Sequence, residues 1–131
     1  RHHRKDRIVK SLRIALWALV ADVATVVVFV AIGRRNHDET TGASGVFGTA
    51  APFLIALIVT WALGRVSRQP IGAGAGVSVW IGTVTIGMVL RNLLFDDGTA
   101  TAFIIVATIF LGAVFNGWRS IARRVFVRAD S

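Results

Sequence analysis

Cysteine is absent from this chain of 131 residues, and its absence excludes several kinds of chemistry. Disulfides, thiolate metal sites, cysteine nucleophiles and cysteine-ligated iron–sulfur clusters all require a thiol. The histidines, His2, His3 and His37, lie outside the long apolar runs, which excludes a bis-histidine haem inside a membrane. Those runs contain no lysine, which excludes a retinal-type Schiff base. Nucleotide loops and nucleophile elbows are also missing. We therefore expect no cofactor, no metal site and no enzymatic activity.

Polar residues are too few to cover a soluble domain of this size. Apolar residues make up 54% of the chain, and the mean hydropathy is +0.66. They form four long runs, each close to the twenty or so residues that a helix needs to cross a bilayer. The predicted spans are 14–32, 46–63, 71–91 and 101–118. The sequence thus predicts an all-α membrane protein with four transmembrane helices in an up-down-up-down bundle.

The first run is interpreted as a retained span rather than a cleaved signal peptide. It is nineteen residues long and contains Asp22, whereas the apolar region of a signal peptide is shorter and uncharged. The segments outside the four spans are a basic arm at 1–13 and a basic tail at 119–131, both predicted to be cytoplasmic.

Basic residues near the span ends predict the orientation, because cytoplasmic segments are enriched in lysine and arginine. With both termini inside, three arginines face outward: Arg34, Arg35 and Arg91. The twelve inner basic residues are Arg1, Arg4, Lys5, Arg7, Lys10, Arg13, Arg65, Arg68, Arg119, Arg123, Arg124 and Arg128. We expect a multi-pass protein of the cell membrane. Its net charge of +8 is expected to meet anionic lipids at the cytoplasmic face, not nucleic acid.

Tryptophan and glycine positions add detail to this bundle. Trp17, Trp61 and Trp118 fall near the predicted inner ends, and together they predict an aromatic belt at the cytoplasmic interface. Glycines in the third span allow neighbouring backbones to approach closely, with Gly72 and Gly76 in a small-xxx-small spacing.

Asp22 is the most informative residue, because a carboxylate inside a span must face the bundle interior or a wet cavity. It lies eight residues above the predicted inner end of its span. Two interpretations stay open: proton or cation coupling, and a protonated aspartate that bonds a neighbouring helix as structural glue. The candidate hydroxyl partners at similar depth are Ser78, Thr83, Thr108 and Thr60.

A second cluster of charges is predicted at the outer face. Histidine and carboxylates together are able to bind a divalent cation. Three arginines nearby oppose a cation, so we favour a salt-bridged network that closes the outer end of the bundle. The cluster comprises Arg34, Arg35, His37, Asp38, Glu39, Arg91, Asp96 and Asp97.

Two stretches carry a family resemblance. Asp22 through VVVFVAIGRRNHDE, and TVTIGMVLRNLLF followed by GTATAFIIVATIFLGAVFNGWR, resemble the prokaryotic membrane family known as domain of unknown function 3054. The resemblance runs from about Trp17 to Arg119. Members look like small four-span proteins, common in actinobacteria and also present in haloarchaea. The resemblance implies the same architecture and no particular activity. It draws attention to the positions Asp22, Gly33, Arg34, His37, Arg91, Trp118 and Arg119.

Three functional hypotheses follow. The first, which we favour, is a small accessory or structural subunit that packs against a larger membrane protein or against copies of itself. The second is an oligomeric transporter or channel for protons, ions or a small solute, with Asp22 and Arg91 along the path. The third is an enzyme acting on lipid through His37, Asp38 and Asp97, although these residues form no recognisable nucleophile–base arrangement.

Overall fold

Four α-helices make up most of the protein. The computed structural model describes residues 2–36, 43–93 and 101–130, and side chains within 4–33, 48–93 and 104–125. The helices are α1 (His2–Asn36), α2 (Ala43–Leu63), α3 (Ala73–Leu93) and α4 (Thr101–Asp130), and a short 3-10 helix, η1 (Val66–Arg68), follows α2. No strand occurs among the described residues. The predicted all-α class is therefore confirmed.

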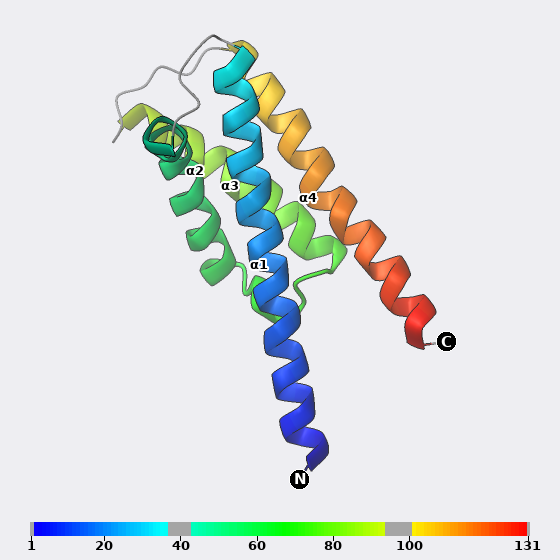
Figure 1. The fold of residues 1–131 in the computed structure, drawn as a ribbon. Helices are drawn as coiled ribbons and strands as arrows, with labels where there is room; N and C mark the ends of the chain where they lie inside the picture. The colour runs from blue at the N-terminus through cyan, green and yellow to red at the C-terminus, as the bar shows by residue number, and fades with distance from the viewer. Residues whose placement is uncertain (1, 37–42, 94–100, 131) are drawn as a thin grey trace.

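The helices alternate in direction. Both chain termini lie at one end of the bundle, together with the connection between α2 and α3, as Figure 1 shows. α2 packs against α3, α3 against α4, and α1 against both α2 and α4. This is the predicted up-down-up-down topology with both termini on one side. We call that side the inner end, following the charge-based prediction that it faces the cytoplasm.

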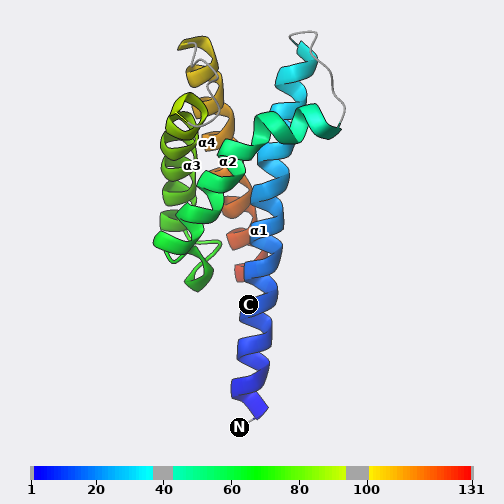
Figure 2. The same ribbon diagram turned by 90° about the vertical axis from the view of Figure 1, so that its left-hand side faces the viewer.

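Three helices are long and apolar enough to cross a membrane: Arg4–Gly33, Ala73–Leu93 and Ile104–Val125. The apolar part of α2, Gly48–Leu63, is shorter. Figure 2 shows the first part of α2 lying across the bundle before the helix turns to run along it. Pro52 lies inside α2 and cannot donate the usual backbone hydrogen bond, which explains a bend there. The protein is thus an all-α membrane bundle whose second helix is bent.

Glycine sets the helix spacing at two crossings. A Cβ atom on Gly82 of α3 would overlap the side chain of Thr60 on α2. A Cβ atom on Gly112 of α4 would lie 2.6 Å from Cε2 of Trp80 on α3. Close approach of α3 to its neighbours therefore requires glycine at these positions, as the sequence predicts for the third span.

The connection between α2 and α3 shapes the inner end of the bundle. Arg65 adopts the left-handed conformation, with φ 51° and ψ 41°, and reverses the chain after α2. Val66 and Pro70 are buried, so the connection packs against the helices instead of projecting from them. This connection brings the Pro70 carbonyl to the site described next.

Candidate functional site

Two charged residues occupy positions where the helical pattern calls for apolar ones. Asp22 lies on the buried face of α1, one turn after Ala18 and one turn before Val26. Arg119 lies one turn after Phe115 on the buried face of α4. Residues four apart share a helix face, so both charges point into the bundle. Both have 0% relative exposure.

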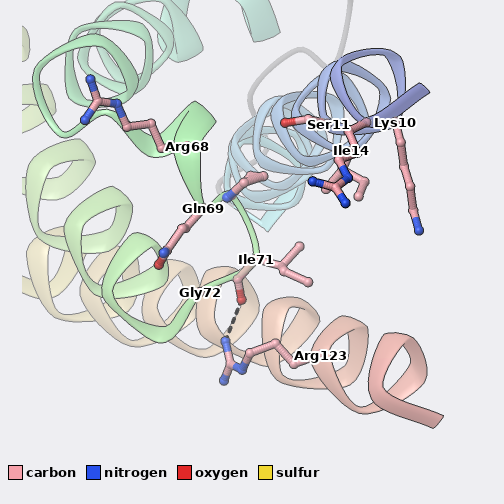
Figure 3. A pocket seen from close by; sticks show the side chains of 10 residues that line it. Lys10, Ser11, Ile14, Arg68, Gln69, Ile71, Gly72 and Arg123 are labelled. Carbon is pink, nitrogen blue, oxygen red and sulfur yellow. Dashed lines mark hydrogen bonds between the residues drawn. The ribbon is translucent and has the colours of Figure 1, made fainter. Parts of the chain in front are cut away.

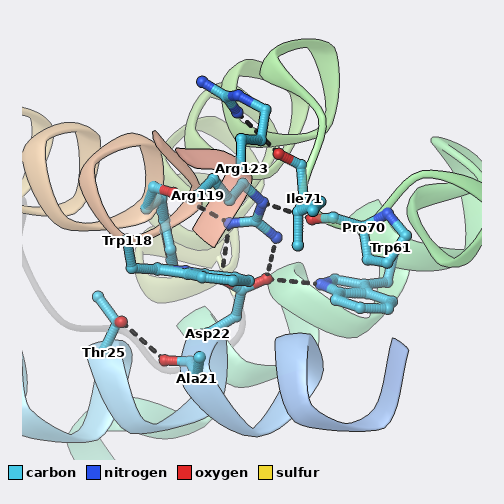
Figure 4. Close-up of polar contacts among 10 residues, drawn as sticks. Ala21, Asp22, Thr25, Trp61, Pro70, Ile71, Trp118, Arg119 and Arg123 are labelled. Carbon is cyan, nitrogen blue, oxygen red and sulfur yellow. Dashed lines mark hydrogen bonds and ion pairs between the residues drawn. The ribbon is translucent and has the colours of Figure 1, made fainter. Parts of the chain in front are cut away.

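Asp22 and Arg119 form a two-pronged ion pair, shown in Figure 4. Nη1 of Arg119 donates to Oδ1 of Asp22 at 2.8 Å, and Nη2 donates to Oδ2 at 2.6 Å. The planar guanidinium matches a carboxylate in this geometry, which strengthens the bond and fixes its direction. The pair joins α1 to α4 across 97 residues of sequence.

Two tryptophans complete the coordination of the Asp22 carboxylate. Nε1 of Trp61 on α2 donates to Oδ2 at 2.9 Å, and Nε1 of Trp118 on α4 donates to Oδ1 at 3.0 Å. Each carboxylate oxygen therefore accepts two hydrogen bonds, which accounts for its acceptor positions. The guanidinium carbon of Arg119 also lies 4.4 Å from the centre of a Trp118 ring, within the range of a cation–π contact.

Two further donors of Arg119 are bound to backbone carbonyls. Nε donates to the Pro70 carbonyl at 2.7 Å, and Nη1 also donates to the Phe115 carbonyl at 3.2 Å. One turn further along α4, Arg123 donates from Nη1 to the Ile71 carbonyl at 2.7 Å. The two arginines thus hold the connection between α2 and α3 against α4.

We call Asp22, Arg119, Trp61, Trp118 and Pro70 the clasp. It joins α1, α2, α4 and the connection before α3, and the two charges neutralise each other inside the bundle. Buried charges are stable only when they are paired and hydrogen-bonded. In the clasp the two charges are paired, the carboxylate accepts four hydrogen bonds, and every nitrogen of the guanidinium donates at least one. No cluster of three or more potential metal-ligating side chains occurs within the described residues. The arrangement is suited to holding helices together, and it presents no open ligand position at the carboxylate.

The partners that the sequence suggested for Asp22 do not contact it. Ser78 is exposed, and the Thr108 hydroxyl donates to a backbone carbonyl one turn earlier in its own helix, at 2.7 Å. Thr60 and Thr83 are buried, but their hydroxyls have no hydrogen-bond partner. These four predicted pairings were wrong, because depth counted along each helix does not specify which face of the helix a residue occupies.

The predicted outer-face cluster remains a prediction. His37, Asp38, Glu39, Asp96 and Asp97 lie outside the described residues, as do the side chains of Arg34 and Arg35. Arg91 is described: it lies in the last turn of α3, at the opposite end of that helix from the clasp.

Reasoning from the residues assigned Arg119 to the cytoplasmic tail and did not pair it with Asp22, although the family resemblance drew attention to its position. The signal was present, because Ala107, Leu111 and Phe115 are buried at four-residue intervals and Arg119 is the next member. The inward hydrogen bonds of two belt tryptophans were not foreseen either. Trp61 and Trp118 donate to Asp22, and of the three only Trp17 is exposed, at 70%. The belt at the interface stays a prediction.

The predicted level of Asp22 also needs correction. Asp22 contacts Trp61, two residues before the end of α2, so it lies near the inner end of the bundle rather than well above it. The predicted depth was counted from the first apolar residue of α1. That residue lies closer to the N-terminus than the level at which the four helices begin to pack together, so the count placed Asp22 too deep. Nearby on α4, the Asn116 amide donates within its own helix, to the Gly112 carbonyl at 2.8 Å.

Comparison with known proteins places the chain in a family. None of the curated proteins and none of the solved structures compared with it matches. The profile of one family, described as "Protein of unknown function (DUF3054)", matches residues 19–122 and so includes every residue of the clasp. The chain belongs to this family, as the resemblance in its first and last spans implied.

Proposed function

We propose that the protein is a non-catalytic structural subunit of the cell membrane, which packs as a preformed bundle against a larger membrane protein. The observation that carries the proposal is the saturated clasp. Asp22 and Arg119 are fully buried, and their charges are engaged with each other and with groups of the same chain. Intramembrane charges that line an ion path instead need contact with water or with the passing ion.

The remaining surface supports the same role. All four helices expose large apolar side chains, among them Ile55 on α2, Ile81 on α3 and Ile109 on α4. Such faces suit lipid or another membrane helix, and helix association in a bilayer depends on shape and polar contacts at close range. A small bundle that satisfies its own charges is able to dock as a rigid unit.

Purification of the tagged full chain from its own membranes in a mild detergent tests this proposal. Native mass spectrometry should find a second membrane protein at a fixed ratio. A bulky Ile81→Trp or Ile109→Trp substitution should release that partner if the residue lies in the docked surface, while the variant remains folded. These two residues are exposed by 52% and 67% and lie on different helices, so the variant that releases the partner identifies the docked helix and the other variant is its control. Recovery of only a monomer or a homodimer contradicts the proposal.

Transport is the second candidate, and the observation that favours it is the ion pair itself. A carboxylate and a guanidinium inside a membrane protein can exchange partners if the helices move, and a proton on Asp22 would free Arg119. This mechanism requires a state in which the clasp opens. Proton or cation flux into liposomes carrying the purified protein, followed by its loss in Asp22→Asn, would support transport. Flux that Asp22→Asn leaves unchanged, or no flux at all, would remove this candidate.

A further inference from the structure

A groove lies beside the clasp at the inner end of the bundle. Its volume is about 480 Å³, and three segments line it: α1, the connection between α2 and α3, and α4. Figure 3 shows Ser11 and Ile14 of α1 on the side of this connection, Lys10 pointing away from it at the rim, and Arg123 of α4 bonded to the Ile71 carbonyl. We call it the basic groove. Its lining residues are Arg7, Lys10, Ser11, Ile14, Arg68, Gln69, Pro70, Ile71, Gly72 and Arg123.

The charges that line the basic groove have one sign. Arg7, Lys10, Arg68 and Arg123 contribute four cations, and no carboxylate belongs to the lining among the side chains that the structure describes. Arg123 is held in place by bonds to the Ile71 carbonyl and to Oγ of Ser120, at 2.7 and 3.1 Å. A guanidinium has five N–H donors, so this bonding orients Arg123 and leaves donors for an anion.

The other walls of the basic groove are apolar or neutral. Ile14, Pro70 and Ile71 provide hydrocarbon, and Ser11 and Gln69 provide neutral polar groups. α3 begins at Ala73, directly after Gly72 of the lining, so the positive end of that helix dipole lies next to the groove. An amphiphilic anion fits this combination better than a small hydrophilic anion does.

The position of the basic groove matches the membrane interface. Its α1 residues precede Trp17, which is 70% exposed, as expected for a tryptophan at the level of the lipid headgroups. Its other walls come from Arg123 of α4 and from the connection beyond the inner end of α2, where we expect the bundle to leave the hydrocarbon. Anionic lipids carry their phosphates at this level.

We propose that the basic groove binds the phosphodiester headgroup of one anionic phospholipid from the cytoplasmic leaflet. Arg7, Lys10 and Arg123 contact the phosphate oxygens, and Ile14 and Ile71 lie along the glycerol and the first acyl carbons. This inference does not depend on the proposed structural role, because the groove is present in the single chain.

The test uses the full chain purified in detergent, with native mass spectrometry to count bound lipids. Phosphatidylglycerol and phosphatidylcholine are titrated separately, followed by glycerol 3-phosphate and inorganic phosphate as soluble competitors. Phosphatidylglycerol should bind at one saturable site and at least tenfold more tightly than phosphatidylcholine. Each basic contact contributes about fivefold, so removing three should weaken binding on the order of a hundredfold.

Two triple variants with equal net charge distinguish lipid binding in the groove from nonspecific electrostatic attraction of anionic lipid to the basic protein. The groove variant carries Arg7→Gln, Lys10→Gln and Arg123→Gln. The control carries Lys5→Gln, Arg13→Gln and Arg124→Gln, three exposed residues on the same two helices that do not line the groove. The groove variant should lose the bound lipid, and the control should change its affinity by less than fivefold.

A single Lys10→Gln variant covers the case in which the triple groove variant does not fold, because Lys10 is exposed. It should weaken phosphatidylglycerol binding about fivefold. Three results would each overturn the proposal: equal losses in the two triple variants, equal affinity for phosphatidylcholine, or displacement of the lipid by equimolar glycerol 3-phosphate. The last result would assign the groove to a soluble phosphate ester.

Discussion

The carboxylate of Asp22 lies where an unpaired charge costs several kcal/mol, and this cost explains the residues around it. Arg119 supplies the opposite charge and two hydrogen bonds, and Trp61 and Trp118 supply one each. Such a pair adds little net stability over a well-packed apolar core, but removal of one member is strongly destabilising. The residues of the clasp therefore depend on one another. The destabilisation caused by substituting one of them is set by the charge or hydrogen-bonding group that is left without a partner.

The three tryptophans near the inner end should differ in their contribution to stability. Trp61→Phe and Trp118→Phe each remove one hydrogen bond to a buried charge, so each should lower the free energy of unfolding by about 1.5–3 kcal/mol. Trp17→Phe is the matched control, and because Trp17 is exposed it should change the value by less than about 0.5 kcal/mol. Denaturant titration in lipid-like micelles measures all three. Equal effects would mean that the tryptophans form only an interfacial belt.

At this scale the sequence predicts one half of the site. Asp22 is identifiable from the sequence, because a carboxylate inside an apolar span is costly unless it has a partner. Its partner follows the last apolar residues of the fourth span, where an arginine normally sets orientation, and so Arg119 was counted as topogenic. Periodicity alone would have placed Arg119 on the buried face, but the choice of Trp61 and Trp118 as donors depends on how the helices are rotated, which hydropathy does not encode.

Among the helices, α1 and α4 differ most from their predicted spans. α1 continues as helix from His2 and α4 continues to Asp130, so the predicted basic arm and tail are largely helical. The extension of α4 beyond residue 118 is what carries Arg119 and Arg123 to the connection between α2 and α3. Hydropathy detects where the apolar residues end, but a helix continues as long as its backbone hydrogen bonds do.

Glycine substitutions should show which helix faces are in contact. Gly112→Ala places a methyl group against Trp80 and should destabilise the bundle by about 1–3 kcal/mol, since the crossing has no room for it. Gly74→Ala meets no atom within 4 Å and should be neutral or stabilising by up to about 1 kcal/mol, because alanine favours helix. Thermal unfolding in detergent compares the two. Similar losses at both positions would contradict the packing described for α3 and α4.

The distribution of basic residues predicts the orientation of the whole molecule in the membrane, and cysteine labelling can test it. The natural absence of cysteine makes single-cysteine labelling clean. Ser67→Cys lies on the exposed inner connection and should react with a membrane-impermeant maleimide only after the cells are opened. Ser44→Cys, before the second predicted span, should react in intact cells. The reverse pattern would show that the bundle is inserted with its termini outside, against the distribution of basic residues.

The clasp is the point at which the molecule becomes one unit, because it joins the first and last helices to the connection between the middle two. An accessory bundle that docks as a rigid unit needs the clasp to stay intact. A transporter that uses Asp22 and Arg119 needs the clasp to open. Both proposals therefore depend on how strongly Asp22 and Arg119 are coupled in the folded protein.

A double-mutant cycle on Asp22→Asn and Arg119→Gln measures that coupling directly, with the free energy of unfolding determined in a bilayer for the parent, both single variants and the double variant. Each single variant leaves a lone buried charge and should lose about 3–5 kcal/mol. The double variant should lose less than the sum, which gives a coupling energy of about 2 kcal/mol or more. Losses that simply add, within about 0.5 kcal/mol, would contradict the clasp as the closure of this bundle.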